Sequence, residues 1–311
     1  LLFRKIMLGL GNSIISGTRL NSAALTSISS PLELSDCILW LDFSDETKMF
    51  TESSNTSGTQ VTDGDKIGTV VNKATASDRL NNFIRSSNAN YRPYYRSADG
   101  GYAEFGGGTN STWGAVRMHS NHGATATNGG VTTDMSTAVI DPHDVTVFFV
   151  MKLQDSDTVT GRMLDLHAGL ADGTGGTQFS FDVNGAGDVM QAFQYASSSG
   201  GGLAHSDSYN GSTDLDTSKH VITYHHVSDA SGGVKVYIDG SEDGSGTYDA
   251  DYSIGFSDSN GNGDLIIGAR SNGSGTVLAD PFKGDMYEII FYNTALSDAN
   301  RILVENYLTN K

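Results

Sequence analysis

The sequence predicts an all-β protein, a sandwich of two antiparallel sheets, on three observations. The 311 residues include 38 glycines, and only 18% of them are charged, a composition typical of many short strands joined by turns. Residues 145–151 form the most strongly β-favouring run in the chain. Residues 220–240 alternate apolar and polar positions on both sides of a turn with two consecutive glycines. Few helices are therefore expected.

The segment 220–240 is the clearest single element. Its first arm places Ile222 and Tyr224 on one face and Val221 and Thr223 on the other, which is the period of two that marks a strand. Its second arm has apolar side chains at positions 234, 236 and 238. A hairpin is not stable alone in water, so its apolar face requires a second layer, and a β-sandwich is the default architecture.

Further strands follow from the same patterns. They are expected at residues 37–42, 69–71, 102–105, 163–166, 179–183, 189–195, 265–269 and 285–292. Residues 91–95 are expected to be extended, because Pro93 removes a backbone donor and disfavours helix at Arg92. Only the C-terminus predicts a helix, with Ser297 as its N-cap and its end at Lys311.

The charge balance excludes two classes of partner. Lys and Arg total 19 against 36 Asp and Glu, a formal net charge of −17, and so acidic a surface repels nucleic-acid phosphates and anionic lipid headgroups. No apolar run reaches the ~18 residues that a spanning helix requires. We therefore expect no nucleic acid and no membrane as partners. The one cysteine, Cys37, has no partner for an intrachain disulfide and is expected to be a buried, unreactive thiol.

Residues 1–32 differ from the rest of the chain, and we expect them to form a docking arm ahead of a globular domain at 33–311. Their first part is apolar with an embedded basic pair. An apolar, glycine-punctuated terminus frays unless it is held down, so the arm is expected to pack on a neighbouring subunit or a larger assembly. The anchoring residues would be Leu1, Leu2, Phe3, Ile6, Met7, Leu8 and Leu10. A signal peptide and an arm that packs only on its own domain are the alternatives.

Several short motifs, in order along the chain, resemble the laminin-G-like branch of the concanavalin A-like lectin/glucanase superfamily. They are Leu39-Trp40-Leu41-Asp42, Asp63-Gly64-Asp65, Tyr91-Arg92-Pro93, the 220–240 hairpin, Ile267-Gly268-Ala269 and the closing run from Gly284 to Ser297 with its helix. The resemblance covers roughly residues 34–311 and implies a concanavalin A-like jelly-roll β-sandwich with a short C-terminal helix. It departs at Phe105-Gly106-Gly107, where relatives tend to carry Phe-Asp-Gly. Because this fold hosts lectins, glucanases and structural modules, it does not fix a function.

Glycosidases of this superfamily carry paired carboxylates on one strand, Glu-x-Asp-x-x-Glu or a near variant, so that nucleophile and acid face one cleft. No such run occurs here. The acidic residues on expected strands are isolated, and we expect them to be solvated and outward-facing: Glu104, Asp165, Asp182 and Glu288. His225 and His226 point to opposite faces and cannot chelate one metal together. We therefore expect no catalytic residues and no enzyme.

One loop offers oxygen ligands in the pattern of a calcium site. Asp258, Asn260, Asn262 and Asp264 stand at alternate positions with glycines for the bend. The glutamate that a complete calcium loop carries at its twelfth position is absent, since residue 269 is Ala. Asn and Gly also make ordinary turns, so a calcium site and no cofactor at all are both open. The turn at residues 63–65 is a weaker candidate of the same kind.

Three functions fit these observations. We favour a virion structural protein of a bacteriophage (a capsid decoration, fibre or tail-associated subunit), because single laminin-G-like domains behind a short Leu-Gly-Leu-Gly leader resemble tailed-phage structural proteins. Such a subunit would bind other virion proteins through its arm, form a homo-oligomer and lie on the surface of the extracellular particle. The alternatives are a secreted carbohydrate-binding module and a bacterial surface-layer or filament subunit whose arm completes a neighbour's sheet.

A virion protein of this kind can also adsorb to host glycans. Proteins hold sugars by aromatic stacking beside polar groups at a sheet face or loop rim. The candidate carbohydrate-binding residues are Tyr94, Tyr95, Trp113 and Tyr209. For each ring, packing in the core or in a loop is the alternative.

Overall fold

The computed structural model describes residues 26–52, 58–75, 83–85, 92–106, 118–119, 144–154, 161–168, 176–184, 189–197, 203–227, 233–246, 263–271, 278–279 and 282–311. In these ranges the chain forms antiparallel strands, short 3-10 turns and the α-helix α2(Asp298–Thr309). The all-β prediction with a C-terminal helix is confirmed.

Sheet A contains eight strands. Their order is β15(Ser241–Gly246), β14(Val234–Ile238), β13(Lys219–His226), β8(Val145–Leu153), β19(Gly284–Tyr292), β6(Tyr102–Phe105) and β5(Tyr94–Arg96), and β1(Cys37–Asp42) also pairs with β19. One edge of β19 pairs with β8, whereas β6 and β1 share its other edge. The last strand of the chain is therefore the centre of this sheet.

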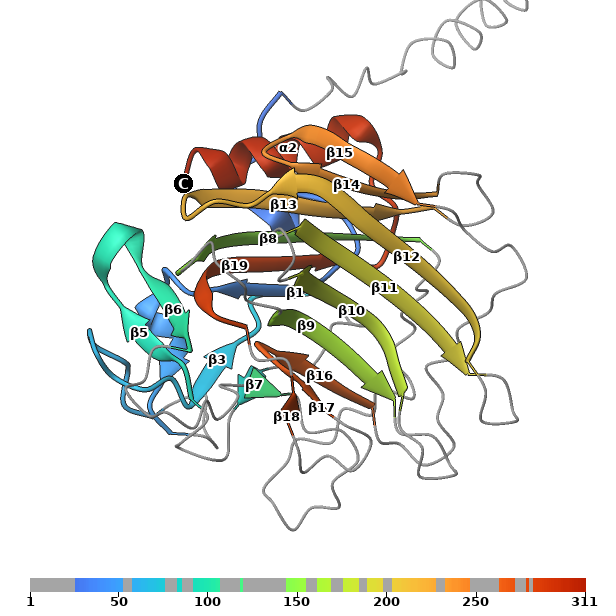
Figure 1. Ribbon diagram of the computed structural model, residues 1–311. Helices are drawn as coiled ribbons and strands as arrows, with labels where there is room; N and C mark the ends of the chain where they lie inside the picture. The colour runs from blue at the N-terminus through green and yellow to red at the C-terminus, as the bar shows by residue number, and fades with distance from the viewer. Residues whose placement is uncertain are drawn as a thin grey trace, which may run out of the picture.

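Sheet B contains nine strands. Their order is β12(Leu203–Asp214), β11(Val189–Ser197), β10(Gly176–Asn184), β9(Gly161–Ala168), β16(Gly263–Ile267), β7(Met118–His119), β4(Phe83–Arg85), β3(Thr69–Val71) and β2(Met49–Phe50). The strands β17(Arg270–Ser271) and β18(Leu278–Ala279) pair with each other, and the 3-10 turns are η1(Pro31–Glu33), η2(Glu46–Lys48) and η4(Ala98–Gly100). Figure 1 shows β9 to β12 as one curved layer and β13, β8, β19 and β1 as another.

The main hydrophobic core fills the space between the two sheets. Phe149 of β8 meets Phe181 of β10 with ring centroids 4.9 Å apart, and Phe181 meets Tyr224 of β13 at the same separation. All three rings are fully buried. Because Ile222 and Tyr224 face this core, the predicted alternation along the 220–240 hairpin is confirmed, and with it the sandwich.

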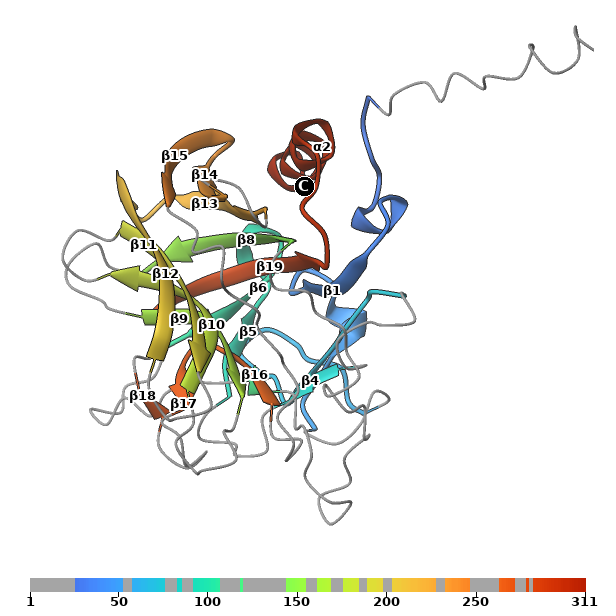
Figure 2. The ribbon, with the colours of Figure 1, turned by 90° about the vertical axis from the view of Figure 1, so that its right-hand side faces the viewer.

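The other face of sheet A is also buried over much of its area. Val221, Phe148 and Ile290 pack there with Leu303 and Val304 of α2 in a second hydrophobic cluster. Figure 2 shows α2 on this side of the molecule beside the N-terminal segment. The hairpin therefore buries both faces of its first strand, where the alternation alone predicts burial of one.

The helix α2 begins and ends close to the prediction. The Ser297 hydroxyl accepts a hydrogen bond from the Asn300 backbone N–H at 3.3 Å, which confirms the N-cap. The helix ends at Thr309, and Lys311 leaves it to reach the sheet. No helix in the described ranges is both long and apolar enough to cross a membrane.

The start of the described chain belongs to the folded domain. Ile28 and Leu34 are buried in the second hydrophobic cluster, and the Tyr292 hydroxyl donates to the carbonyl of Pro31 at 2.8 Å. The arm boundary expected at residue 32 therefore falls too late, because residues from 28 onward already pack on this domain. The anchoring residues proposed for the arm, 1–10, lie outside the described ranges.

Two outer edges of sheet A are already hydrogen-bonded. Next to β5, the Tyr95 N–H donates to the Asp65 carbonyl at 2.8 Å, and the Gly64 N–H donates to the Tyr95 carbonyl at 2.9 Å. Next to β15, Ser212 and Thr213 of β12 donate to Asp243, so this edge is tied to sheet B. Paired edges resist the addition of another strand.

Candidate functional site

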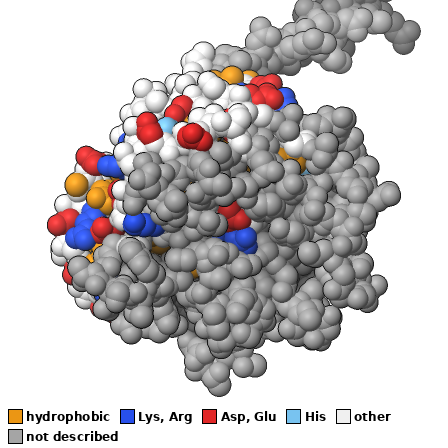
Figure 3. Space-filling view, in the orientation of Figure 1, with side chains coloured by type: hydrophobic (Ala, Val, Ile, Leu, Met, Phe, Trp, Pro, Cys, Tyr) orange, Lys and Arg blue, Asp and Glu red, His pale blue; other side chains and the backbone are white. Residues whose placement is uncertain are grey.

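The part of sheet A that α2 leaves uncovered carries a group of aromatic and charged side chains. We call it the tyrosine face: Tyr94, Arg96, Tyr102, Glu104, Asp285 and Tyr287. These side chains point away from the main core, since their strand neighbours Tyr95, Ala103, Phe105 and Met286 point into it. Figure 3 shows basic, acidic and hydrophobic side chains gathered at the edge of the molecule formed by β5 and β6.

The strand register places aromatic and charged residues of this face in a checkerboard. Tyr94 stands opposite Glu104, and Arg96 stands opposite Tyr102. Arg96 and Glu104 are therefore diagonal neighbours, and the Arg96 guanidinium donates to the Glu104 carboxylate at 2.5 Å. Their side chains are 34% and 19% exposed. Two half-buried rings thus flank an ion pair that solvent can reach.

A second aromatic pair extends the face onto β19. The rings of Tyr102 and Tyr287 have centroids 5.1 Å apart and are tilted by 42°. Tyr287 is the extra residue of a bulge, since β8 pairs with Met286 and then with Glu288. A bulge re-aims a side chain, and here it turns both Tyr287 and Glu288 outward. The Lys219 ammonium, from the start of β13, lies over the Tyr287 ring, 5.2 Å from its centroid.

Two carboxylates of the tyrosine face lie side by side. Glu104 and Asp285 are directly opposite each other on β6 and β19, and the Gln154 amide nitrogen lies 3.3 Å from the one and 3.4 Å from the other. Burial raises the pKa of Asp285 above its ordinary value, and the negative charges of Glu104 and Asp99 add to this effect. The face therefore presents clustered hydrogen-bond acceptors beside aromatic rings.

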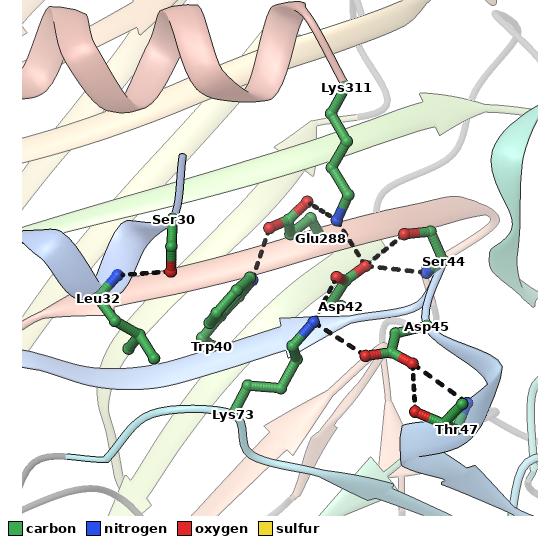
Figure 4. Close-up of polar contacts among 10 residues, drawn as sticks. All are labelled: Ser30, Leu32, Trp40, Asp42, Ser44, Asp45, Thr47, Lys73, Glu288 and Lys311. Carbon is green, nitrogen blue, oxygen red and sulfur yellow. Dashed lines mark hydrogen bonds and ion pairs between the residues drawn. The ribbon is translucent and has the colours of Figure 1, made fainter. Parts of the chain in front are cut away.

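Figure 4 shows a second polar group, which we call the Lys311 cluster: Trp40, Asp42, Asp45, Lys73, Glu288 and Lys311. The Lys311 ammonium lies 2.7 Å from Asp42 and 2.8 Å from Glu288, which stand opposite each other on β1 and β19. The indole N–H of Trp40 donates to the other oxygen of Glu288 at 2.6 Å. One lysine beyond the helix thus joins the first and last strands of sheet A.

A second lysine completes this cluster. The Lys73 ammonium binds Asp42 at 2.9 Å and Asp45 at 3.0 Å, and it lies 4.2 Å from the Trp40 ring centroid. Burial works to raise the pKa of Asp42, but Lys311, Ser44 and Lys73 outweigh it and hold this pKa below its ordinary value. Each carboxylate of the cluster has a cationic partner, so the cluster braces the fold.

The isolated strand acids are not the solvated groups that the sequence predicts. Glu288 is 3% exposed and Asp182 is 7% exposed, and Asp182 accepts two hydrogen bonds from Arg162. That expectation was wrong for both, because partners distant in the chain supply the cations that make burial tolerable. Glu104 is half-buried, and only the backbone of Asp165 is described.

The predicted sugar-binding aromatics are not gathered at one site. Tyr94 lies on the tyrosine face, whereas Tyr95 is 2% exposed and belongs to the main core. A ring so buried cannot stack on a ligand, so the prediction for Tyr95 is wrong, and its hydroxyl instead donates to Glu46 at 3.0 Å. Trp113 lies outside the described residues, and Tyr209 is described only as backbone in β12.

The calcium prediction is not tested by the described residues. Asp258, Asn260 and Asn262 lie outside them, and Asp264 is described only as backbone in β16. In the weaker candidate, Asp63 accepts from the Ser97 N–H and Asp65 accepts from Thr62, so both carboxylates brace turns. Within the described ranges no group of three or more His, Cys, Asp or Glu side chains could hold a metal ion.

Two other predictions about reactive side chains are confirmed. Cys37 is buried, and burial raises the pKa of its thiol to about 12, which keeps it unreactive. His225 and His226 face opposite sides of sheet A: His226 stacks near Tyr224 in the main core, while His225 lies 2.8 Å from the carbonyl of Leu296 under α2.

The sequence pattern missed most of the tyrosine face. Tyr102, Asp285 and Tyr287 lie in stretches that were correctly predicted as strands, but nothing local indicates that β6 and β19 are neighbours. The alternation in residues 102–105 did place Tyr102 and Glu104 on a common face. At residues 285–288 the bulge breaks the alternation, so the pattern could not show that Tyr287 and Glu288 share a side.

A family model described as "Concanavalin A-like lectin/glucanases superfamily" matches residues 124–300, more than half of the chain. No curated protein matches the sequence. The match begins after β5 and β6 and includes β8 and β19, so it spans the centre of sheet A and most of sheet B.

Among solved structures, the chain is similar to the CBM40 domain of the Ruminococcus gnavus IT-sialidase bound to alpha2,3 sialyllactose, with 14% identity, a TM-score of 0.42 and coverage of 55% of this chain and 90% of that one. It is also similar to the leech intramolecular trans-sialidase, with 15% identity, a TM-score of 0.42 and coverage of 60% and 27%. The receptor-binding domain of botulinum neurotoxin type G gives 10% identity, a TM-score of 0.44 and coverage of 89% and 52%. All three similarities are distant.

Proposed function

The chain belongs to the concanavalin A-like lectin/glucanases superfamily, and we propose that it is a structural subunit of a bacteriophage virion that displays a non-catalytic, lectin-like domain to host-surface glycans. The superfamily supports the lectin-like part, and the apolar leader at residues 1–25 supports docking on other virion proteins. On this proposal the protein lies on the surface of the particle as a homo-oligomer.

The observation that carries glycan binding is the checkerboard of the tyrosine face. Sugar rings present C–H groups that pack on aromatic rings, and their hydroxyls need donors and acceptors at the rim. Tyr94 and Tyr102 supply half-buried rings, and diagonal neighbours in an antiparallel pair stand about 7–8 Å apart. Arg96 and Glu104 supply a donor and an acceptor between them. This spacing suits one or two sugar units lying flat on the sheet.

Ion pairing supports a non-catalytic role. A glycosidase needs one carboxyl group as proton donor and a second as nucleophile or base, both open to the substrate. Asp42 and Glu288 face each other, but Lys311 lies between them and both are buried. Glu104 is held by Arg96, and Asp285 is 6% exposed. We propose that these carboxylates brace the sheet or accept hydrogen bonds, and do not cleave a glycosidic bond.

A glycan array tests the binding proposal with the full chain and two variants. We expect Tyr94→Ala to lose at least tenfold in affinity for the glycans that the parent protein binds, and Tyr94→Phe, the matched control that keeps the ring, to lose less than threefold. Equal binding by the parent protein and Tyr94→Ala would reject the tyrosine face as the site. An array without any bound glycan would reject the lectin role.

Deletion of residues 1–25 tests the docking proposal. This deletion spares Ile28, Pro31 and Leu34, which pack on the domain, so the truncated protein should fold and keep its glycan binding. We expect it to fail to incorporate into particles when it competes with the full chain. Incorporation at the level of the full chain would reject the arm.

The two alternatives differ in what they require of the domain. A secreted carbohydrate-binding module would use the same tyrosine face but would bind no particle, so the deletion would change nothing. A filament built by strand addition needs an open sheet edge, and the backbone hydrogen bonds beside β5 disfavour addition at that edge of sheet A.

A further inference from the structure

We infer that the tyrosine face selects uncharged saccharides over acidic ones and that Glu104 and Asp285 are the residues that reject the acidic ligands. This inference rests on the proposed glycan binding and names the class of ligand.

The position of the two carboxylates puts them at the centre of the face. Glu104 stands next to Tyr94 across β5 and β6, and next to Asp285 across β6 and β19. Tyr102 and Tyr287 lie on the same side of the sheet. A ligand that packs on Tyr94 or Tyr102 therefore brings its polar groups against Glu104, while the buried Asp285 beside it, 6% exposed, acts on the ligand through its charge.

Ionised carboxylates accept hydrogen bonds and donate none, so they favour ligands that can donate a hydrogen bond. Glu104 already accepts from Arg96 on one oxygen and from Gln154 on the other, and each oxygen keeps a second lone pair. A sugar hydroxyl can donate to that lone pair. The carboxylate or sulfate of an acidic sugar has no proton to donate, and it would meet like charge at contact distance.

The surrounding charges do not reverse this preference. The Arg96 guanidinium is paired with Glu104. The positive charge of Lys152 on β8 opposes the rise in the pKa of Asp285 that burial causes. Asp99, in η4, adds a further negative charge near both tyrosines. Burial raises the pKa of the Tyr102 hydroxyl, and the charges of Asp285, Glu104 and Asp99 add to this effect while Arg96 opposes it. Burial likewise raises the pKa of Tyr287, and Asp285 and Asp99 add to it.

Two cations lie beside rings of the tyrosine face and could favour an acidic ligand: the Lys66 ammonium is 5.5 Å from the Tyr94 ring centroid, and the second is Lys219. Its side chain lies at an exposed position beside the Tyr287 ring, and an ammonium there could pair with a carboxylate on the sugar. The chain as a whole carries a net charge of −17, which opposes the approach of anions at low salt. Replacing Lys66 or Lys219 by Met therefore tests whether either cation binds an acidic sugar.

The experiment is a glycan array in which each neutral oligosaccharide is paired with its sialylated or sulfated form. We expect the full-length protein to bind neutral members at least tenfold more tightly than their acidic partners at low salt. Asp285→Asn and Glu104→Gln should reduce this ratio of affinities (the gap) at least threefold, because each variant should bind the acidic member more tightly. Glu242→Gln removes one negative charge at the far end of sheet A, on β15, and should leave the gap unchanged.

The outcomes separate this inference from the proposed function. Acidic members that bind as tightly as neutral ones, or a gap that Asp285→Asn and Glu104→Gln leave unchanged, would overturn the inference while glycan binding stands. Binding of acidic members that Lys66→Met or Lys219→Met abolishes would overturn it in favour of an anionic ligand. Absence of binding to every member would overturn both. Circular dichroism on each variant confirms that a loss of binding is not a loss of fold.

Discussion

The two halves of one sheet face differ sharply. Over β13, β8 and the C-terminal half of β19, the outer face of sheet A is mostly apolar and covered by α2 and residues 28–34. The polar groups buried there are hydrogen-bonded, as Thr223 is to Glu305 and Arg301 is to Glu305. Over β5, β6 and the N-terminal half of β19, it carries the tyrosine face, where Tyr94, Arg96, Tyr102 and Glu104 are partly exposed. Asp285 and Tyr287 of this face are buried, and Tyr287 belongs to the second hydrophobic cluster. Both halves are paired antiparallel, with a bulge in β19 between them, so the difference comes from the side chains and from the elements that pack on them.

The comparison shows how a sheet can be both a structural and a recognition surface. Aliphatic residues such as Val221 and Ile290 gain about 1.5–3 kcal/mol each from burial, which favours a covering helix. Tyrosines and ion-paired side chains gain less from a cover, because their polar atoms must keep partners. The Lys311 cluster lies at the boundary between the two halves of the face. There Lys311, which follows α2, pairs with Asp42 of β1 and Glu288 of β19.

The largest expected effect comes from breaking the covered half. Val304 of α2 is fully buried in the second hydrophobic cluster, so Val304→Asp should lower the free energy of unfolding by more than about 4 kcal/mol. Ile302 on the same helix is 45% exposed, and Ile302→Asp should change it by less than about 0.5 kcal/mol. Denaturant titration measures both, and similar losses would show that α2 does not hold the sheet as described.

A smaller effect is expected at the boundary. Lys311→Met leaves Asp42 and Glu288 facing each other without their shared cation, and we expect a loss of about 2 kcal/mol, below the usual cost of breaking a buried pair because Lys311 is partly exposed. The control is Lys235→Met, which breaks an exposed pair with Glu242 and should cost less than about 1 kcal/mol. If both lysines cost the same, the Lys311 cluster is not a brace.

The uncovered half should tolerate substitution far better. Tyr102→Ala removes one half-buried ring that contacts Tyr287, and we expect it to cost about 1 kcal/mol of stability while glycan binding falls at least tenfold. Calorimetric unfolding and the array measure the two quantities on one preparation. A large loss of stability with unchanged binding would assign this tyrosine to the fold and remove it from the site.

The smallest effect concerns His225, which holds the start of α2. Its Nε2 donates to the Leu296 carbonyl, and Nδ1 is buried without a hydrogen-bond partner. Burial lowers the pKa of this histidine, and Arg301 and Lys235 add to the effect, although Leu296 and Asp298 oppose it. Below the unfolded pKa of about 6.5, the unfolded chain binds more protons than the folded one, so stability should fall as the pH falls.

The variant His225→Gln isolates this contribution. Its stability should depend less on pH than that of the parent protein between pH 7 and pH 5, while the two should run in parallel above pH 7. Urea titrations at several pH values give the comparison. Parallel curves over the whole range would show that His225 is not kept neutral by its place under α2.

Local sequence patterns predicted most of the strands and the helix, but few residues of the candidate site. The strands at residues 37–42, 145–151 and 285–292 and the cap at Ser297 follow from alternation and capping chemistry. Tyr94 and Tyr95 were both named as candidates, because the sequence did not show which of the two faces the core. A shift of one residue decides which face of a strand a ring occupies. The acids Asp182 and Glu288 looked isolated because Arg162 and Lys311, their cationic partners, stand 20 and 23 residues away.

The amino-acid sequence by itself determined the class of fold, because alternation, glycine-rich turns and a capped helix are local properties that each segment carries with it. Only the tertiary structure decided which half of sheet A is covered, which carboxylates are paired and which tyrosines share a face. Those outcomes depend on strand neighbours such as β6 and β19, which are 182 positions apart at their first residues, and on a bulge that turns Tyr287 outward. Pairing over such separations is set by the packing of the whole domain, and no local pattern records it.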